Sequence, residues 1–222
     1  MKQYLTKKKF KVALAATLAM VAAISLDAAI YVEKGGNSNG PDTFQLASTS
    51  MKLAGINPFS KGTMATFVVR KTPRDFANVK FRDGTGEKLS LKDWRGKIVL
   101  LNLWATWCAP CRHEMPGLDR LQGAMGGDNF EVVAVSIDRK GVAAAQGFLD
   151  EIKTKNLRLY IDKTAKISRE AEAFGMPTTI LINREGKELG RMIGPAEWDS
   201  NQAKALITAA IRGKLIGAKK AE

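Results

Sequence analysis

The 222-residue sequence predicts an α/β fold, in which a mixed central β-sheet carries helices on both faces. Two runs, Ile98–Trp104 and Phe130–Ile137, are predominantly apolar, as is typical of central strands that are buried on both sides. Segments with helical spacing alternate with these strands, and a hairpin pattern follows them. The expected order is β-β-β-α-β-α-β-α-β-β-α, and its first two strands form an added N-terminal β-hairpin.

The other elements follow in order from apolar periodicity and from the turn residues that separate them. An Asp-Gly-Thr-Gly turn predicts the first hairpin, an Asn-Arg-Glu-Gly turn predicts the second, and Gly175 is expected to end the third helix. The expected strands are Val79–Phe81, Lys88–Ser90, Leu157–Ile161, Thr178–Ile182 and Glu188–Ile193, and the expected helices are Cys111–Met125, Val142–Ile152, Ile167–Phe174 and a last one capped by Asp199 or Ser200.

Residues 1–32 are predicted to be an N-terminal signal anchor. The first eleven residues contain lysines and no acid, and an apolar run follows over residues 12–32, which as a helix would span roughly 31 Å. Asp27 is costly inside a bilayer, but it lies one turn from the end of the run. The alternative is a cleaved signal, although the best cut, after Ala28, has Leu26 at the −3 position. The lysines belong on the cytoplasmic side, so the rest of the chain is expected in the periplasm, tethered to the inner membrane.

The next segment, residues 33–62, is rich in Gly, Pro, Asn and Ser and predicts a flexible tether, so the folded domain is expected to span residues 63–218. The chain carries a formal net charge of +13, but its Lys and Arg are dispersed and no aromatic-basic motif accompanies them. We therefore expect no nucleic-acid partner. With 2 Cys and 1 His, the chain also lacks the ligands of a zinc ribbon or finger.

The two cysteines form a Cys-Ala-Pro-Cys motif, Cys108 to Cys111, between a predicted buried strand and a predicted helix. Cys108 then falls at the helix N-terminus, where free backbone N–H groups and the helix dipole stabilise a thiolate. Cys111 lies one turn further on and can attack a sulfur bonded to Cys108. This arrangement predicts a redox-active pair, and a metal pair or an accidental spacing is the alternative.

Glu114 follows Cys111 by one helical turn and lies on the side of the predicted apolar stripe. A carboxyl group there would have a raised pKa and could exchange a proton with the Cys111 thiol. The alternative is a first-turn glutamate that extends to water. His113 falls on the opposite helix face and is expected at the surface, which argues against a Cys-Cys-His metal site.

Several separate segments resemble the thioredoxin superfamily, and more narrowly its TlpA-like branch of membrane-anchored bacterial thiol–disulfide oxidoreductases. The resemblance covers about residues 70–215, and we therefore expect the thioredoxin fold. The matching segments are Leu89–Lys97, Asn102–Cys108, Arg112–Pro116, Gly175–Thr179 and Ile193–Trp198.

The resemblance implies roles for individual residues. Cys108 would be the nucleophile, Cys111 the resolving thiol and Glu114 the buried acid–base carboxyl group. Pro177 would be a cis-proline facing the cysteines, so that Met176 or its backbone pairs with an extended substrate segment, and Trp107 and Thr178 would complete the substrate-binding set. Cytosolic thioredoxins carry a buried Asp where this chain has Asn102, and because Asn cannot titrate, Glu114 is the natural replacement.

The resemblance further implies a reductant of disulfides in periplasmic client proteins, in cytochrome oxidase copper-site or cytochrome c assembly. Two threonines after Pro177, where the cytochrome c branch usually has Glu-Thr, favour the copper-site pathway. The chain has no flavin or nicotinamide motif, so the Cys108–Cys111 disulfide is the expected redox group and a membrane protein the expected electron donor. The alternatives are a module that holds Cu(I) between the two thiolates and a general periplasmic thiol oxidant.

Overall fold

The computed structural model describes residues 59, 61–76 and 78–215. Within them, eight strands form one mixed sheet in the order β1-β8-β7-β4-β5-β6-β2-β3. The strands are β1 (Val68–Asp75), β2 (Lys80–Asp83), β3 (Lys88–Ser90), β4 (Ile98–Trp104), β5 (Phe130–Ser136), β6 (Tyr160–Ile161), β7 (Thr178–Ile182) and β8 (Lys187–Ile193). The helices are α3 (Ala109–Met125), α4 (Val142–Glu151), α5 (Lys166–Glu170) and α6 (Asn201–Ile211), with short 3-10 turns at Gly62–Met64 and Leu91–Trp94.

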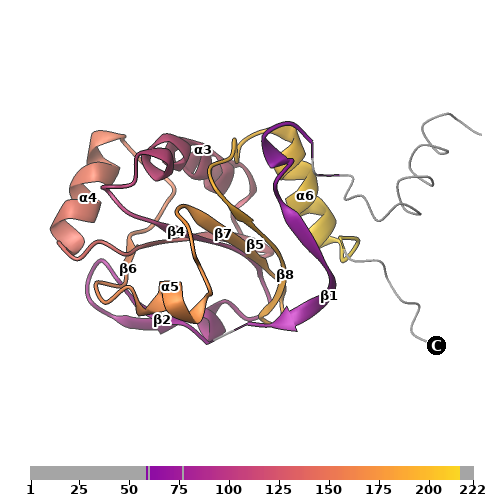
Figure 1. Ribbon diagram of the computed structural model, residues 1–222, viewed down its shortest axis with the longest axis horizontal. Coiled ribbons are helices and arrows are strands. Elements are labelled where there is room, and N and C mark those ends of the chain that lie inside the picture. The colour runs from indigo at the N-terminus through magenta and orange to yellow at the C-terminus, as the bar shows by residue number, and fades with distance from the viewer. Residues whose placement is uncertain (1–58, 60, 77, 216–222) are drawn as a thin grey trace, which may run out of the picture. The chain divides into compact units, whose positions relative to one another are not determined.

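The sheet centres on β4, whose seven residues are all buried. This strand pairs in parallel with β5 and antiparallel with β7. Its continuous apolar sequence is explained by this position, because layers cover it on both faces. In the view of Figure 1, α3, α4 and α6 lie above the sheet and α5 lies below it, which confirms the predicted helices on both faces.

The N-terminal hairpin is also confirmed. Strands β2 and β3 pair antiparallel, and β2 also pairs with β6, so the hairpin extends the sheet at one edge. The Asp83 carboxylate closes the turn by accepting hydrogen bonds from the backbone N–H groups of Thr85 and Glu87, each at 2.9 Å. Ser200, one of the two expected caps, begins α6 and accepts a hydrogen bond from Ala203 N at 3.2 Å.

The strand β1 was missed by the sequence patterns, which place no element between residues 63 and 78. It contains Pro73 and several charged residues, which are poor strand signals. It nevertheless pairs antiparallel with β8, and the register shifts between Val69 and Arg74. A proline is tolerated here because β1 is the edge strand and the shift places Pro73 outside the regular ladder.

The expected helix Ile167–Phe174 is wrong in its second half. Helix α5 ends at Glu170, and Glu172 has a φ of 52° in the left-handed region. Gly175 is therefore not the residue that ends this helix. The segment from Ala171 to Gly175 instead forms the approach to β7, and this path leaves Phe174 exposed.

The expected strand Leu157–Ile161 is likewise shorter, because Asp119 on α3 intercepts its first part. The Asp119 carboxylate accepts hydrogen bonds from the backbone N–H groups of Lys155, Asn156 and Leu157, at 3.1, 2.8 and 3.0 Å. The Leu157 N–H, which belongs to the expected strand, is then unavailable to a sheet ladder, and β6 retains only two residues.

We expect Asp119→Ala to lower the free energy of unfolding by about 2–3 kcal/mol, because it removes the charged acceptor of three part-buried backbone N–H groups. Urea denaturation would measure the change. The matched control is Asp150→Ala, since Asp150 is exposed and its carboxylate accepts one hydrogen bond from Gln146, and its expected cost is below about 0.5 kcal/mol. Equal losses in the two variants would contradict a capping role for Asp119.

The predicted anchor and nearly all of the predicted tether lie outside the described residues. Among the residues that the structure does describe, no helix is both long and apolar enough to cross a membrane.

Candidate active site

The two cysteines lie where β4 gives way to α3, and they form a disulfide with an S–S distance of 2.02 Å and a Cα–Cα distance of 5.3 Å. Cys108 is the N-cap of α3, and its sulfur accepts a hydrogen bond from Cys111 N at 3.3 Å. After reduction, the same N–H and the helix N-terminus would stabilise a Cys108 thiolate. Cys108 retains 6% of its surface and Cys111 none, so Cys108 carries the sulfur that a client can reach.

The loop before Cys108 is held by Asp138, which lies two residues after the end of β5. Its carboxylate accepts hydrogen bonds from Thr106 N and Thr106 Oγ1, each at 2.8 Å, and from Ser136 Oγ at 2.8 Å. Trp107, the next residue, is exposed, as expected of a substrate-contacting side chain. Asp138 was not predicted from the sequence, although an aspartate at the carboxyl end of a predicted buried strand was an available signal.

The second loop of the site leads into β7, and its Met176–Pro177 peptide bond is cis, as the resemblance implied. Thr178 pairs with Leu103 on β4, so this loop lies next to the carboxyl end of β4. Pro177 O accepts a hydrogen bond from Gly194 N at 2.9 Å, and Met176 is half-buried. The Thr178 hydroxyl is buried and donates to Gly175 O at 2.6 Å, so this side chain holds the loop from inside.

Glu114 is buried on α3, which settles the choice between a buried and a solvent-extended side chain. Its Oε1 accepts a hydrogen bond from Asn102 Nδ2 at 2.8 Å, and its Oε2 accepts from Ala196 N and Trp198 Nε1, each at 3.0 Å. All three partners are donors, so the surroundings are arranged for the ionised carboxylate. The cost of burying a charge opposes them.

Burial has the larger effect and raises the pKa of Glu114 to about 7, although the hydrogen bonds from Ala196, Asn102 and Trp198 act in the opposite direction. Both protonation states are therefore accessible at neutral pH, as a group that gives or accepts a proton requires. Glu114 follows Cys111 by one turn of the same helix. It also lines a groove of about 560 Å³ that opens to solvent and includes His113, which is exposed as expected.

Asn102 connects Glu114 to the strand that follows the cis-proline. Its Nδ2 donates to both Glu114 Oε1 and Thr179 Oγ1, the latter at 2.9 Å. Its Oδ1 is buried and has no hydrogen-bond partner within the described part of the chain. From the sequence, Asn102 was predicted only to be a group that cannot titrate. Its structural role is to donate to the carboxyl group that does.

Trp198 and Thr179 were also not assigned roles from the sequence, although both stand in segments that carried the resemblance. The structure brings Asn102, Glu114, Thr179 and Trp198 together from four separate elements. Across the described residues, no group of three or more His, Cys, Asp or Glu side chains is placed to hold a metal ion.

Comparison with known proteins agrees with this geometry. Residues 69–187 match the model of the AhpC/TSA family. The chain is 34% identical over 121 residues to thiol-disulfide oxidoreductase ResA of Bacillus cereus, covering 54% of this chain and 69% of the relative. It is 39% identical over 104 residues to the thioredoxin-like protein YneN of Bacillus subtilis, covering 46% of this chain and 59% of the relative.

Among solved structures, the chain is similar to a putative thiol:disulfide interchange protein DsbE from Chlorobium tepidum. The TM-score is 0.57 at 30% identity, and the match covers 63% of this chain and 96% of the other. A DsbF homologue from Corynebacterium diphtheriae matches with a TM-score of 0.52 at 26% identity, covering 64% of this chain and 90% of the other. These likenesses place the eight-stranded sheet and its helices in the thioredoxin-like fold.

Proposed function

The chain belongs to the AhpC/TSA family and is a thiol–disulfide oxidoreductase of the thioredoxin type, and from this premise we propose that it works as a reductant of client disulfides. The observation that carries the proposal is a disulfide with one reachable sulfur, Cys108, and one buried sulfur, Cys111, one helical turn from the buried carboxyl group of Glu114, whose pKa is raised to about 7. That arrangement provides a nucleophile, a resolving thiol and a proton acceptor.

The reaction begins with the reduced pair. The Cys108 thiolate attacks one sulfur of a client disulfide and releases the other as a thiolate, so that a mixed disulfide forms. Cys111 then loses its proton to Glu114 and attacks the Cys108 sulfur, which releases the second client thiolate. The client gains two electrons and, after protonation, carries two thiols, while the pair becomes the disulfide seen here.

Glu114 lines a groove that is open to solvent, and it would release its proton to water through that groove. The proton acceptor matters most in the second step, because Cys111 is fully buried and cannot deliver its proton directly to water. A buried thiol also has a raised pKa, so its thiolate forms slowly without a base.

We place the catalytic domain in the periplasm, anchored to the inner membrane by residues 1–32. Lysines followed by a long apolar run support this location. The clients we propose are assembly factors of the cytochrome oxidase copper site, with cytochrome c assembly as the second pathway. The threonines that follow Pro177 support the first pathway, and a membrane protein would restore the reduced pair.

The reduction potential of the Cys108–Cys111 pair tests the direction of the chemistry. We expect a value at or below about −220 mV, which would place the pair with thioredoxins and glutaredoxins. The full chain in detergent would be equilibrated with glutathione or dithiothreitol buffers, and the fraction of reduced thiols would be counted by alkylation and mass spectrometry. A value near about −120 mV would identify a strong oxidant and overturn the proposed direction.

A further inference from the structure

Several exposed apolar side chains lie on or near the segments around the cis-proline loop. Trp107 precedes Cys108, and Phe174 precedes Pro177 by three residues. Ile193 pairs with Thr178, the first residue after the proline, and Val68 pairs with the neighbouring Arg191. Their exposed fractions are 66% for Trp107, 90% for Phe174, 50% for Ile193 and 65% for Val68. Such a group of exposed apolar residues is typical of a binding surface.

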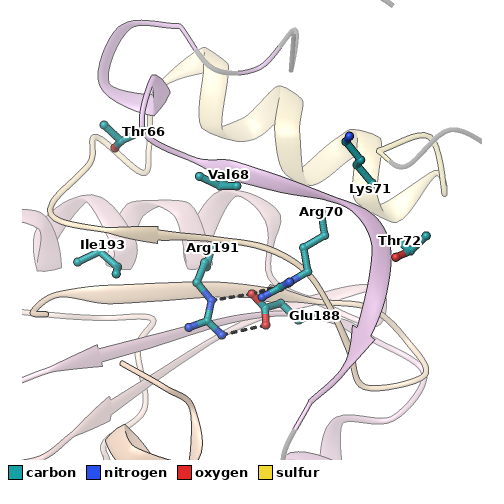
Figure 2. Close-up of a pocket in the computed structure, with 8 residues that line it drawn as sticks. All are labelled: Thr66, Val68, Arg70, Lys71, Thr72, Glu188, Arg191 and Ile193. Carbon is teal, nitrogen blue, oxygen red and sulfur yellow. Dashed lines mark hydrogen bonds and ion pairs between the residues drawn. The ribbon is translucent and has the colours of Figure 1, made fainter. Parts of the chain in front are cut away.

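Two of these residues, Val68 and Ile193, also line a groove of about 590 Å³ over β1 and β8. Figure 2 shows the groove, with Thr66, Val68 and Ile193 toward one end and Arg70, Arg191 and Glu188 toward the other. The groove adjoins the cis-proline loop, because a Cβ placed on Gly175 would lie only 2.7 Å from Ile193 Cγ2. An extended segment that crosses the loop can therefore continue into the groove.

The far end of the groove is positively charged. Arg191 Nε and Arg70 Nε lie 2.6 and 3.0 Å from Glu188 Oε1, and Arg74 Nη2 lies 2.9 Å from Glu188 Oε2. Burial would raise the pKa of Glu188, but the hydrogen bonds from Arg191 and the positive charges of Arg191 and Arg70 outweigh it and lower the pKa to about 2. Glu188 is thus ionised at any physiological pH and neutralises one guanidinium.

Two of the three arginine charges remain, and one of these is balanced by Glu172, whose carboxylate lies 2.8 Å from Arg74 Nη1. Lys71 also lines the groove and adds to its positive charge. One arginine from β1 bound to Glu188 would be enough to hold β1 against β8. Arg70 is the member with charge to spare: its side chain is 31% exposed, it lines the groove, and its contact with Glu188 is an ion pair without hydrogen-bond geometry. Within the part of the chain that the structure describes, its two Nη groups donate no hydrogen bond, so they can bind an anion from the groove side.

We propose that this groove binds the client on one side of its reacting cysteine, and that it selects an extended segment with an apolar residue followed by an acidic one. The proposal rests on the proposed function, because it names the class of client that the same site would reduce. Two strand spacings separate β7 from β1, or about 10 Å, which an extended chain crosses in about three residues. The acidic residue is therefore expected roughly three to five residues from the client cysteine.

The test uses the full chain in its reduced form and pairs of synthetic peptides, each with one intramolecular disulfide. The two peptides of a pair differ only in two residues that lie three to five positions from the reactive cysteine: one peptide has Asp at both positions and the other has Asn. In one pair these positions are N-terminal to the cysteine, and in a second pair they are C-terminal to it. Oxidation of the protein at low salt is followed by its intrinsic tryptophan fluorescence, with quenched samples alkylated and counted by mass spectrometry. We expect the Asp peptide of at least one pair to react about three- to tenfold faster than its Asn counterpart.

Arg70→Gln should bring that ratio close to one. Glu188 keeps Arg191 and Arg74 in this variant, so the β1–β8 pairing is retained. The matched control is Lys88→Gln, which removes the same charge from β3 at the opposite edge of the sheet and should leave the ratio unchanged. Equal rates for Asp and Asn peptides in the wild-type protein, or equal effects of the two variants, would overturn the proposal.

A failure of the proposed reductant function can be distinguished from a failure of the groove proposal. The wild-type protein must reduce a small neutral disulfide, bis(2-hydroxyethyl) disulfide, and a lack of that reaction refutes the reductant rather than the groove. In that case, the peptides are made with Ser in place of Cys, and their affinities for the oxidised protein are measured. The Asp and Asn peptides are then compared by affinity instead of by rate. Tighter binding of Asp peptides that Arg70→Gln abolishes would support the groove, and equal affinities would reject it.

Discussion

Cys108→Ser is expected to abolish disulfide reduction, whereas Cys111→Ser is expected to stop the reaction halfway. Cys108 carries the reachable sulfur at the helix N-terminus, so without it no thiolate can attack the client. Without Cys111 the mixed disulfide still forms, but no buried thiol resolves it. The measurement is a single turnover of the reduced full chain with a disulfide-bonded peptide, and mass spectrometry of the quenched mixture detects the adduct.

The two serine variants are matched controls for each other, because each removes one sulfur from the same turn of α3. Their adduct patterns should differ: the Cys111→Ser variant should accumulate a covalent complex with the peptide, and the Cys108→Ser variant should not. Full activity in the Cys108→Ser variant, or an adduct formed through Cys111, would contradict the assigned order of attack.

The core of the fold was predictable because its signals are local. Strand β4 is a continuous apolar run, and the Cys-Ala-Pro-Cys segment after it starts a helix, so the position of Cys108 at the N-terminus of α3 followed from neighbouring residues. The hairpin that contains β7 and β8 followed from one turn in the same way. The signal for each of these elements lies within the element itself or in the turn next to it.

The errors arose where distant residues decide the local structure. Strand β1 exists because β8 offers it a partner and Arg70 and Arg74 bind Glu188, more than a hundred residues away. Strand β6 is short because Asp119, on a separate helix, binds the backbone before it. No pattern within residues 68–75 or 157–161 carries that information.

The same difference between local and distant signals applies to the candidate site. Glu114 could be inferred because its spacing from Cys111 places it on the apolar face of one helix. Its hydrogen-bond donors could not, since Asn102, Ala196 and Trp198 come from β4 and from the segment between β8 and α6. Which oxygen each donor reaches is a tertiary property, and it determines how far burial can raise the pKa.

Glu114→Gln is expected to slow the resolving step at neutral pH by about 100-fold, since general acid–base catalysis contributes at least that much. The ionised carboxylate accepts the proton of Cys111 in the wild-type protein, and a neutral amide cannot. The variant should still fold, because Asn102 can turn its unpartnered Oδ1 toward the new amide N–H₂. Stopped-flow measurement of peptide reduction between pH 5 and 9 would test this.

The pH dependence carries the sharper test. In the wild-type protein the rate should rise with pH through an inflection near 7, as Glu114 loses its proton, and this inflection should be lost in the variant. The matched control is Glu185→Gln, at an exposed position in the turn between β7 and β8, which should leave the profile unchanged. A Glu114→Gln profile that superimposes on the wild-type profile would remove the assigned role.

The same group makes a prediction for stability that does not depend on turnover. The pKa of Glu114 is about 7 in the folded protein against 4.5 for the ordinary side chain, so the folded state binds the proton more tightly. The wild-type free energy of unfolding should therefore fall between pH 4.5 and 7, by about 3 kcal/mol, and level off above pH 7. The Glu114→Gln variant has no proton to lose there, so its stability relative to wild type should rise over the same interval. A constant difference across that interval would mean that the carboxyl group titrates in the folded protein as it does in the unfolded chain, and a proton acceptor poised at neutrality would then have to be sought elsewhere.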